Sequence, residues 1–497
     1  MDTINVLAFD LGASSGRGML ARFDGKKITL EEIHRFPHNF SVLNGHAYWN
    51  IISLYEEMKK GMCLCREPLA GVGFDTWGVD CGLLDAEGNL VGMPGSYRDA
   101  ALDDDNMNKV LALLGGSERE DLGAVKSGER YVFEKTGIAC LAYNTLYKLC
   151  YLKEAMPEQW GAVDQILFMP NLIEYLFSGV KHSEYSIAST SQLLDMKEKK
   201  WAVELMEKAG LDPAKLAPLE YAGKDLGPLR PEIAKEVGQE NLHILSVPGH
   251  DTACAVAAVP AREKEFTFLS SGTWSLMGIS SETMLTGEQV IRDKISNEGT
   301  WDGGYRPTVN IIGLWMNQEL RRCFQRQGKD YSFAQMNEMA AAQKPLQSFI
   351  RPDDFMQPGD YPEKIRSYCA ETGQPVPESD GALVRCVLES LAMRYRQVYQ
   401  SLRPYITWEE KLYIVGGGAQ NQVLNQFTAN ALGIPVITGA SEATAVGNVM
   451  EQLYALGAYK TREEKCDILA ASFETAEYLP KDTKAWEEAY QRFEKLY

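Results

Sequence analysis

Near its start the chain reads Asp10-Leu11-Gly12-Ala13-Ser14-Ser15-Gly16-Arg17, directly after an apolar run over residues 4–9. About halfway along, Ser270-Ser271-Gly272-Thr273 follows the apolar residues 266–269 in the same way. Each pattern predicts a buried strand, a turn of small residues and a second strand. Such turns let backbone N–H groups approach phosphate oxygens. Two of them, on two halves of one chain, predict a nucleotide that is held from both sides.

The sequence around the two turns predicts one structural unit used twice. The first half predicts a three-strand meander, a helix and further strands, over residues 4–9, 17–23, 27–36, 48–65, 71–74 and 79–84. The second half predicts a similar series of strands and helices, over 243–247, 253–259, 266–279, 412–415, 423–432, 434–438 and 442–456. We therefore expect an α/β fold whose halves are distant copies of each other. The more polar span 100–240 is expected to cap the substrate.

Composition and charge limit the class of protein. The chain has 497 residues, 45% hydrophobic and 24% charged, as in globular proteins of this length. Its net charge of −18 argues against nucleic acid or a membrane surface as partner, because both attract clustered Lys and Arg. We expect no signal peptide and no membrane span. Ten scattered cysteines predict free thiols and a cytoplasmic location, and no pattern indicates an oligomeric state.

Asp10 lies where the first buried strand meets its turn. Ser14 and Ser15 add hydroxyl donors, and Arg17 can bind a phosphate through two N–H groups. Asp10 is then placed to hold Mg²⁺, mainly through water, because Mg²⁺ keeps much of its hydration shell. The alternative is a plain hairpin in which the Asp side chain caps the turn.

The segment Gly249-His250-Asp251-Thr252 predicts a turn that opens a helix of small residues. The helix dipole favours the ionised form of an Asp at this place, and a carboxylate there can accept a proton from an alcohol. Asp251 is therefore the candidate general base, and His250 a candidate hydrogen-bond partner of a hydroxyl. An ordinary helix N-cap and a structural histidine are the alternatives.

Two further segments suggest ligand contacts. In Asp75-Thr76-Trp77-Gly78-Val79-Asp80, an indole lies beside polar groups, an arrangement that binds sugars; a core tryptophan is the alternative. Gly416-Gly417-Gly418-Ala419 follows a buried strand but lacks the G-x-G-x-x-G spacing of dinucleotide sites. Flat backbone beside adenine or ribose is the functional interpretation of these glycines, and a tight strand-to-helix turn the structural one.

Together these segments resemble the sugar kinases of the FGGY group, over nearly the whole chain and in the same order. Residues 10–17, 75–80, 248–253 and 310–315 are most similar to the kinases of that group that act on L-rhamnulose. The resemblance implies two actin-like (ribonuclease H-like) ATPase domains with a cleft between them. We expect an N-terminal, sugar-binding domain over 1–245, a C-terminal, nucleotide-binding domain over 246–460 and a helical tail over 461–497.

The resemblance also implies a role for each matching residue. ATP phosphates would be bound by Ala13, Ser14, Ser15, Gly16 and Arg17; Thr273 would contact the γ-phosphate region, and Gln318 and Gly417 would border the nucleotide. The sugar would be held by Gly78, His250, Asp251, Thr252 and Asn310, with Trp77 beside them. Asp251 would be the general base and Asp10 the Mg²⁺ residue. Ala13 replaces the Thr or Ser of many members, as it does in the L-rhamnulose kinases.

The implied reaction is ATP-dependent phosphorylation of a ketose, with L-rhamnulose 1-phosphate as the expected product in L-rhamnose catabolism. L-Fuculose or another ketose is an alternative substrate. A nucleotide-driven actin-like switch and a carboxylate-pair glycoside hydrolase are alternatives from other classes. Trp77 and Asp251 argue against the switch, and the two phosphate loops argue against the hydrolase.

Overall fold

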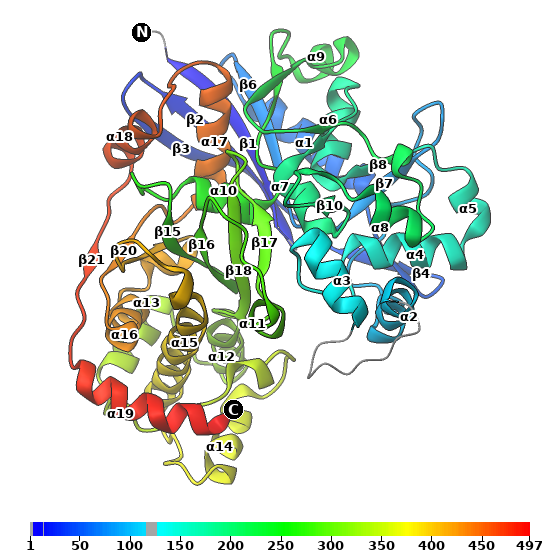
Figure 1. Cartoon of the computed structure of the whole chain (residues 1–497). Helices are drawn as coiled ribbons and strands as arrows, with labels where there is room; N and C mark the ends of the chain where they lie inside the picture. The colour runs from blue at the N-terminus through cyan, green and yellow to red at the C-terminus, as the bar shows by residue number, and fades with distance from the viewer. Residues whose placement is uncertain (1–2, 13, 116–126) are drawn as a thin grey trace. The chain divides into compact units, whose positions relative to one another are not determined.

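The computed structural model describes residues 3–12, 14–115 and 127–497, which form two compact units that interleave along the chain. The first unit comprises Met1–Arg262, Ser281–Pro307 and Thr444–Ser472. The second comprises Glu263–Ser280, Thr308–Ala443 and Phe473–Tyr497. Each unit is built on one mixed β-sheet (Figure 1).

The sheet of the first unit has the order β13-β14-β6-β1-β2-β3. Its strands are β1 (Ile4–Leu11), β2 (Ser15–Phe23), β3 (Ile28–Pro37), β6 (Gly71–Thr76), β13 (Lys224–Pro228) and β14 (His243–Ser246). Strands β1, β2 and β3 form the antiparallel meander that the sequence predicts, while β6 runs parallel to β1 and β14 parallel to β6. The first small-residue turn therefore joins β1 to β2.

The sheet of the second unit repeats this scheme in the order β18-β16-β15-β19-β20-β21. Its strands are β15 (Phe266–Ser271), β16 (Trp274–Ser280), β18 (Tyr305–Ile312, of which Thr308–Ile312 belong to this unit), β19 (Leu412–Val415), β20 (Val436–Thr438) and β21 (Glu477–Tyr478). Strands β15, β16 and β18 form an antiparallel meander, and β19 and β20 continue the sheet in parallel. The predicted α/β fold and its internal repeat are thus confirmed.

Helices cover both faces of the first sheet. One face packs on α1 (Ile51–Leu64), α6 (Met169–Ser178) and α9 (Pro231–Val237) through a continuous apolar core. Asn50 caps the first of these helices by accepting a hydrogen bond from the Ser53 N–H at 3.0 Å. The other face meets α17 (Ala443–Ala455), where the Gln452 amide donates to the Leu7 carbonyl at 3.0 Å. Side chains alternate between the two faces of a strand, and the helices on each side of the sheet bury both sets.

The first unit has a second apolar core, formed by residues between Cys81 and Leu216, which include much of the span predicted to cap the substrate. The remaining helices of the unit are α2 (Asp104–Gly115), α3 (Ser127–Thr136), α4 (Thr145–Ala155), α5 (Pro157–Gly161), α7 (Tyr185–Ala188), α8 (Val203–Lys208), α10 (Asp251–Ala257), α11 (Glu288–Arg292) and α18 (Arg462–Ser472). The short strands are β4 (Phe40–Leu43), β5 (His46–Trp49), β7 (Cys81–Leu84), β8 (Gln165–Phe168), β9 (Ser183–Glu184), β10 (Leu194–Asp195), β11 (Lys200–Trp201), β12 (Leu219–Glu220) and β17 (Ser296–Gly299). The predicted capping role stays a prediction.

The second unit contains α12 (Trp315–Arg326), α13 (Phe333–Ala341), α14 (Tyr361–Glu371), α15 (Asp380–Leu402), α16 (Gln422–Leu432) and α19 (Thr483–Phe493). Within the described residues, none of the helices of either unit is long and apolar enough to cross a lipid bilayer.

The compact units differ from the consecutive division expected at 245/246 and 460/461. Helix α10, which follows the first of these positions, belongs to the first unit. The expected helical tail is divided, with α18 in the first unit and α19 in the second. After the second unit, the chain re-enters the first unit at Thr444, within α17. There α17 packs closely on α10, because a Cβ on Gly447 would lie only 1.8 Å from the Cys254 carbonyl oxygen.

Candidate functional site

The turn that precedes helix α10 is fixed by hydrogen bonds on both sides. The Thr76 N–H, at the end of β6, donates to the Gly249 carbonyl at 2.9 Å. The Gly249 N–H donates in turn to the buried carboxylate of Glu184 at 2.8 Å. That carboxylate also accepts from the backbone and hydroxyl of Ser186 at 2.9 and 2.6 Å. The backbone that carries Asp251 is therefore held rigidly by Thr76 of β6 and by Glu184 of β9.

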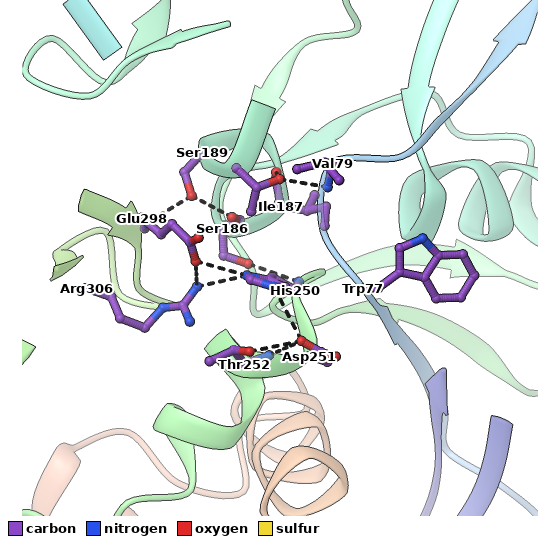
Figure 2. A network of polar contacts seen from close by, with 12 residues as sticks. Trp77, Val79, Ser186, Ile187, Ser189, His250, Asp251, Thr252, Glu298 and Arg306 are labelled. Carbon is purple, nitrogen blue, oxygen red and sulfur yellow. Dashed lines mark hydrogen bonds and ion pairs between the residues drawn. The ribbon is translucent and has the colours of Figure 1, made fainter. Parts of the chain in front are cut away.

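Asp251 is the first residue of α10, and its side chain is 30% exposed. Its Oδ1 accepts from the backbone N–H and the hydroxyl of Thr252 at 2.5 and 3.1 Å. The Nε2 of His250 lies 3.4 Å from the same oxygen. Figure 2 shows these contacts converging on one side of the carboxylate. The described residues place no such contact on Oδ2, which is the oxygen left for a ligand.

His250 joins Asp251 to a partly buried ion pair that the sequence did not predict. Its Nδ1 lies 2.9 Å from Arg306 Nη2 and 3.2 Å from Glu298 Oε2 (Figure 2). Arg306 and Glu298 are themselves 2.5 Å apart, and the Arg306 side chain is fully buried. Burial alone would raise the pKa of Glu298, but the positive charge of Arg306 next to it outweighs burial and lowers that pKa to about 2. Glu298 is therefore ionised at neutral pH.

Gly78 borders the His250 ring without a side chain of its own. A Cβ there would lie 3.4 Å from His250 Nε2 and 3.3 Å from Thr190 Cγ2. The next residue, Val79, has a φ of 64°, which is rare for a β-branched side chain. The Thr190 hydroxyl accepts from its N–H at 3.0 Å, and the Thr145 hydroxyl donates to its carbonyl at 2.7 Å. This strained backbone brings Gly78 next to His250.

Trp77 lies in a buried aromatic cluster. Its ring centroid is 4.2 Å from that of Trp49, and its Nε1 donates to Asp80 at 2.8 Å. The residue is 5% exposed. This is the core arrangement that the sequence left open as an alternative, and contact between Trp77 and a sugar stays a prediction.

The first small-residue turn places Asp10 and Arg17 opposite each other. The two residues are paired in register on β1 and β2, and Arg17 Nη2 lies 2.5 Å from Asp10 Oδ2. The Gly12 N–H donates to the Ser15 carbonyl at 3.1 Å, which closes the turn. Ser14 is exposed, whereas Gly16 packs so closely on Phe36 that a Cβ would lie 2.3 Å from its ring. Ala13 lies outside the described residues.

Asp75 is a buried carboxyl next to this turn, in parallel register with Asp10. Asn448 of α17 donates to its Oδ2 at 2.7 Å, while Oδ1 has no hydrogen-bond partner among the described residues. Burial, and next to it the charge of Asp10, raises the pKa of Asp75 well above its ordinary value. The sequence offered no signal for this arrangement, because Asp75 and Asn448 are 373 positions apart.

In the second unit, Thr273 and Gly417 follow the neighbouring parallel strands β15 and β19, and Gln318 lies on α12. The Gln318 amide donates to the Thr273 hydroxyl at 3.2 Å, and Thr273 is exposed. A Cβ on Gly418 would lie 2.0 Å from the Ser271 hydroxyl, so the glycine turn needs a residue without a side chain there. Gly417 is exposed, and a Cβ on it would meet open space. These residues leave flat, accessible backbone beside the second small-residue turn.

The structure thus gathers the predicted sugar residues Gly78, His250, Asp251 and Thr252 within the first unit. Asn310 is exposed and belongs to the second unit. Sequence reasoning missed Glu184, Glu298 and Arg306, which form the layer behind Asp251 and His250.

Two family models match the chain. Residues 117–258 match the N-terminal domain, and residues 267–456 the C-terminal domain, of the FGGY family of carbohydrate kinases. A rhamnulokinase of Bacteroides thetaiotaomicron is 39% identical over 495 residues, covering 98% of both chains. A rhamnulokinase of Pectobacterium carotovorum is 37% identical and covers 99% of this chain and 96% of that protein.

Solved structures are similar to this chain in fold. A xylulose kinase from Rhodospirillum rubrum matches with a TM-score of 0.80 at 17% identity, over 99% of this chain and 98% of that chain. A glycerol kinase of Plasmodium falciparum, solved with ADP, matches with a TM-score of 0.77 at 14% identity, over 99% and 97%.

Proposed function

Because the chain belongs to the FGGY family of carbohydrate kinases, we propose that it transfers the γ-phosphoryl group of ATP to L-rhamnulose, forming L-rhamnulose 1-phosphate. The support for this sugar is the identity of 36–39% with several proteins called rhamnulokinase, over nearly the whole chain. The observation that carries the chemistry is the carboxylate of Asp251, held by one oxygen and open at the other.

Asp251 is the proposed general base. Three donors or ring contacts on Oδ1 fix the orientation of the carboxylate, so Oδ2 can accept the proton of the sugar's primary hydroxyl. The hydroxyl oxygen then attacks the γ-phosphorus in line, and the bond from this phosphorus to the bridging oxygen of ADP breaks, so that ADP leaves. Phosphoryl transfer depends mostly on positioning and on neutralising charge, and a rigid base contributes to the first of these.

Most of the proposed sugar-binding residues lie around the start of α10 in the first unit. The Gly78 backbone lies against the His250 ring, and His250 and Thr252 are polar residues at the start of α10. Trp77 and Asn310 complete the set that we propose. The polar groups would bind the hydroxyls of a ketose, and Gly78, without a side chain, would leave the His250 ring in its place beside Asp251.

The nucleotide residues are proposed in each unit separately. In the first unit, Ser14, Ser15, Gly16 and Arg17 follow Asp10, and Ala13 belongs to the same set. In the second, Thr273 and Gln318 are hydrogen-bonded to each other, and Gly417 offers accessible backbone. Serine hydroxyls, backbone N–H groups and the Arg17 guanidinium are suited to phosphate oxygens.

Mg²⁺ fits the oxygen donors of the first turn. Asp10 and Asp75 lie side by side in register on β1 and β6, and the buried Oδ1 of Asp75 has no hydrogen-bond partner among the described residues. Within the same residues there is no group of three or more His, Cys, Asp or Glu that could hold a metal alone. We propose that Asp10 holds Mg²⁺ mainly through water, with Asp75 behind it. The ion would neutralise phosphate charge.

The location is also proposed. All ten cysteines are free thiols, which supports a reducing compartment such as the cytoplasm.

A panel of ketoses tests the proposed reaction. ADP formation is measured with L-rhamnulose, L-fuculose, D-xylulose and D-ribulose, and without sugar, and the product is identified by mass. We expect the largest kcat/KM with L-rhamnulose. The Asp251→Asn variant should lose about 10²–10⁴-fold in kcat and still bind ATP. A preference for another ketose would refute the substrate, ADP release that no sugar stimulates would favour a switch, and near-normal turnover of Asp251→Asn would refute the base.

A further inference from the structure

The contacts of the His250 ring with Arg306 determine which ring nitrogen carries the proton. A guanidinium has only N–H donors and stays protonated in proteins. Arg306 Nη2 lies 2.9 Å from Nδ1, so Nδ1 must accept a hydrogen bond there. A neutral ring whose Nδ1 accepts carries its proton on Nε2. That nitrogen is the one 3.4 Å from Asp251 Oδ1.

Glu298 holds the guanidinium in this place. Its Oε2 accepts from the same Nη2 at 2.5 Å, whereas Nδ1 of His250 is 3.2 Å from that oxygen. Arg306 therefore makes the two shorter contacts, with Glu298 and with His250, and the direct contact between His250 and Glu298 is the longest of the three. A proton on Nδ1 would point at Nη2, an N–H against an N–H, so the pair disfavours that tautomer. Arg306 is fully buried and Glu298 is 15% exposed, so the guanidinium side of these contacts is shielded from water.

We propose that Glu298 and Arg306 are positioning residues that hold His250 as the Nε2–H tautomer, with this proton directed to Asp251 Oδ1. Figure 2 shows the chain of contacts from Arg306 and Glu298 through the imidazole to Asp251. The inference rests on the proposed function, because it gives Asp251 its role as base. The opposite tautomer would turn a ring lone pair toward the carboxylate and repel it.

Loss of the Nε2–H tautomer should slow phosphoryl transfer to the sugar and leave ATP binding unchanged. With Nε2–H in place, Oδ1 is occupied by donors and Oδ2 faces the sugar hydroxyl. When the tautomer changes, the carboxylate loses this orientation, and misplacement by about 1 Å can cost about 100-fold in rate. ATP affinity should not follow, since neither Glu298 nor Arg306 belongs to the proposed nucleotide residues.

Proton–nitrogen correlation NMR on ¹⁵N-histidine-labelled protein reads the tautomer directly. The chain has only six histidines, and the His250→Gln variant identifies the His250 signals. In the wild type we expect an unprotonated Nδ1 and a protonated Nε2. In Arg306→Met, Nδ1 should gain the proton and donate it to Glu298. A protonated Nδ1 in the wild type, or unchanged signals in Arg306→Met, would overturn the proposal.

The second measurement is kinetic and has a matched control. We expect Arg306→Met to lower kcat about 10- to 100-fold, with the dissociation constant of ADP within about twofold of wild type. Lys465→Met is the control, because it also removes the cation of a buried ion pair in the first unit, with Glu451 at 2.8 Å. It should keep the kcat of the wild type. An equal loss in both variants would mean that any broken buried pair has this effect, and would overturn the proposal.

A doubly substituted chain guards against misfolding. Arg306→Met combined with Glu298→Gln leaves no unpaired buried charge, and we expect it to fold, to lose the exclusive protonation of Nε2 and to show the lowered kcat. Unchanged signals in it would again overturn the proposal. If the wild type phosphorylates no ketose, the proposed function fails while the NMR result still decides the tautomer. If the wild type is active but the signals do not move, only this inference fails.

Discussion

Replacing Lys148 by Met should destabilise the first unit, because it breaks a buried ion pair. Lys148 Nζ donates to Asp80 Oδ1 and to the Gly95 carbonyl, the latter at 3.1 Å. The side chains of Lys148 and Asp80 are 4% and 0% exposed. Without the ammonium group, a carboxylate stays in the interior with its charge uncompensated.

The remaining contacts of Asp80 set the magnitude. Its Oδ2 accepts from the indoles of Trp49 and Trp77 at 2.6 and 2.8 Å and from the Tyr97 N–H at 3.2 Å. Removing one partner of a buried pair typically costs 3–5 kcal/mol, and these three donors still stabilise the charge. We therefore expect a loss of about 3 kcal/mol in the free energy of unfolding, at the lower end of the range.

A double-mutant cycle isolates the pair. Combining Lys148→Met with Asp80→Asn leaves no unpaired charge, so the double substitution should cost at least about 1 kcal/mol less than the sum of the single ones. Unfolding in urea measures all three variants. Lys135→Met is the control, since Lys135 pairs with Glu204 at 2.8 Å on the surface of the same unit. This substitution should change the free energy of unfolding by less than about 0.5 kcal/mol.

The outcome that would refute this reasoning is a cost below about 1 kcal/mol for Lys148→Met, or single costs that simply add. Either result would mean that the site relaxes or admits water. Enzyme kinetics provide a second test. Asp80 follows Gly78 by two positions, so a shift of Asp80 should disturb the proposed sugar site. Folded Lys148→Met protein should therefore have a raised KM for the sugar and an unchanged affinity for ADP.

Three further predictions use the same unit. Gly78→Ala should raise the sugar KM about 10-fold or more with little change in stability, because its Cβ would come within 3.4 Å of His250 Nε2; an unchanged KM would contradict the proposed site. Gly447→Ala should lower the free energy of unfolding by more than about 2 kcal/mol, since its Cβ would overlap a carbonyl of α10; thermal unfolding measures it. Burial lowers the pKa of His182, but the charge of Glu174 outweighs burial and raises that pKa. The pair therefore stabilises the folded state fully below about pH 6.5, and this contribution is lost as the pH rises through the raised pKa. The loss of stability caused by His182→Gln, measured by urea unfolding, should shrink between pH 6 and pH 9.

Much of the fold could be predicted because the signals are local. Apolar runs such as residues 4–9 and 412–415 lie in the centre of their sheets, as β1 and β19, and a strand buried on both faces has few polar residues. Small-residue turns marked both hairpins. The interleaving of the units could not be predicted in this way, because it depends on contacts such as that between Asn448 and Asp75, 373 positions apart.

The predictable part of the candidate site is the part that its own segment specifies. Asp251 begins a helix after a turn, which the residues around it indicate, yet a plain N-cap would have the same sequence pattern. What separates a base from a cap is the layer behind it. Glu298 and Arg306 come from β17 and β18, and no spacing in the sequence relates them to His250. The carboxylate of Asp251 can act as an oriented base only when side chains distant in sequence decide which of its oxygens is occupied. Glu298 and Arg306 therefore distinguish a base from a helix cap here, and a local sequence pattern cannot identify them.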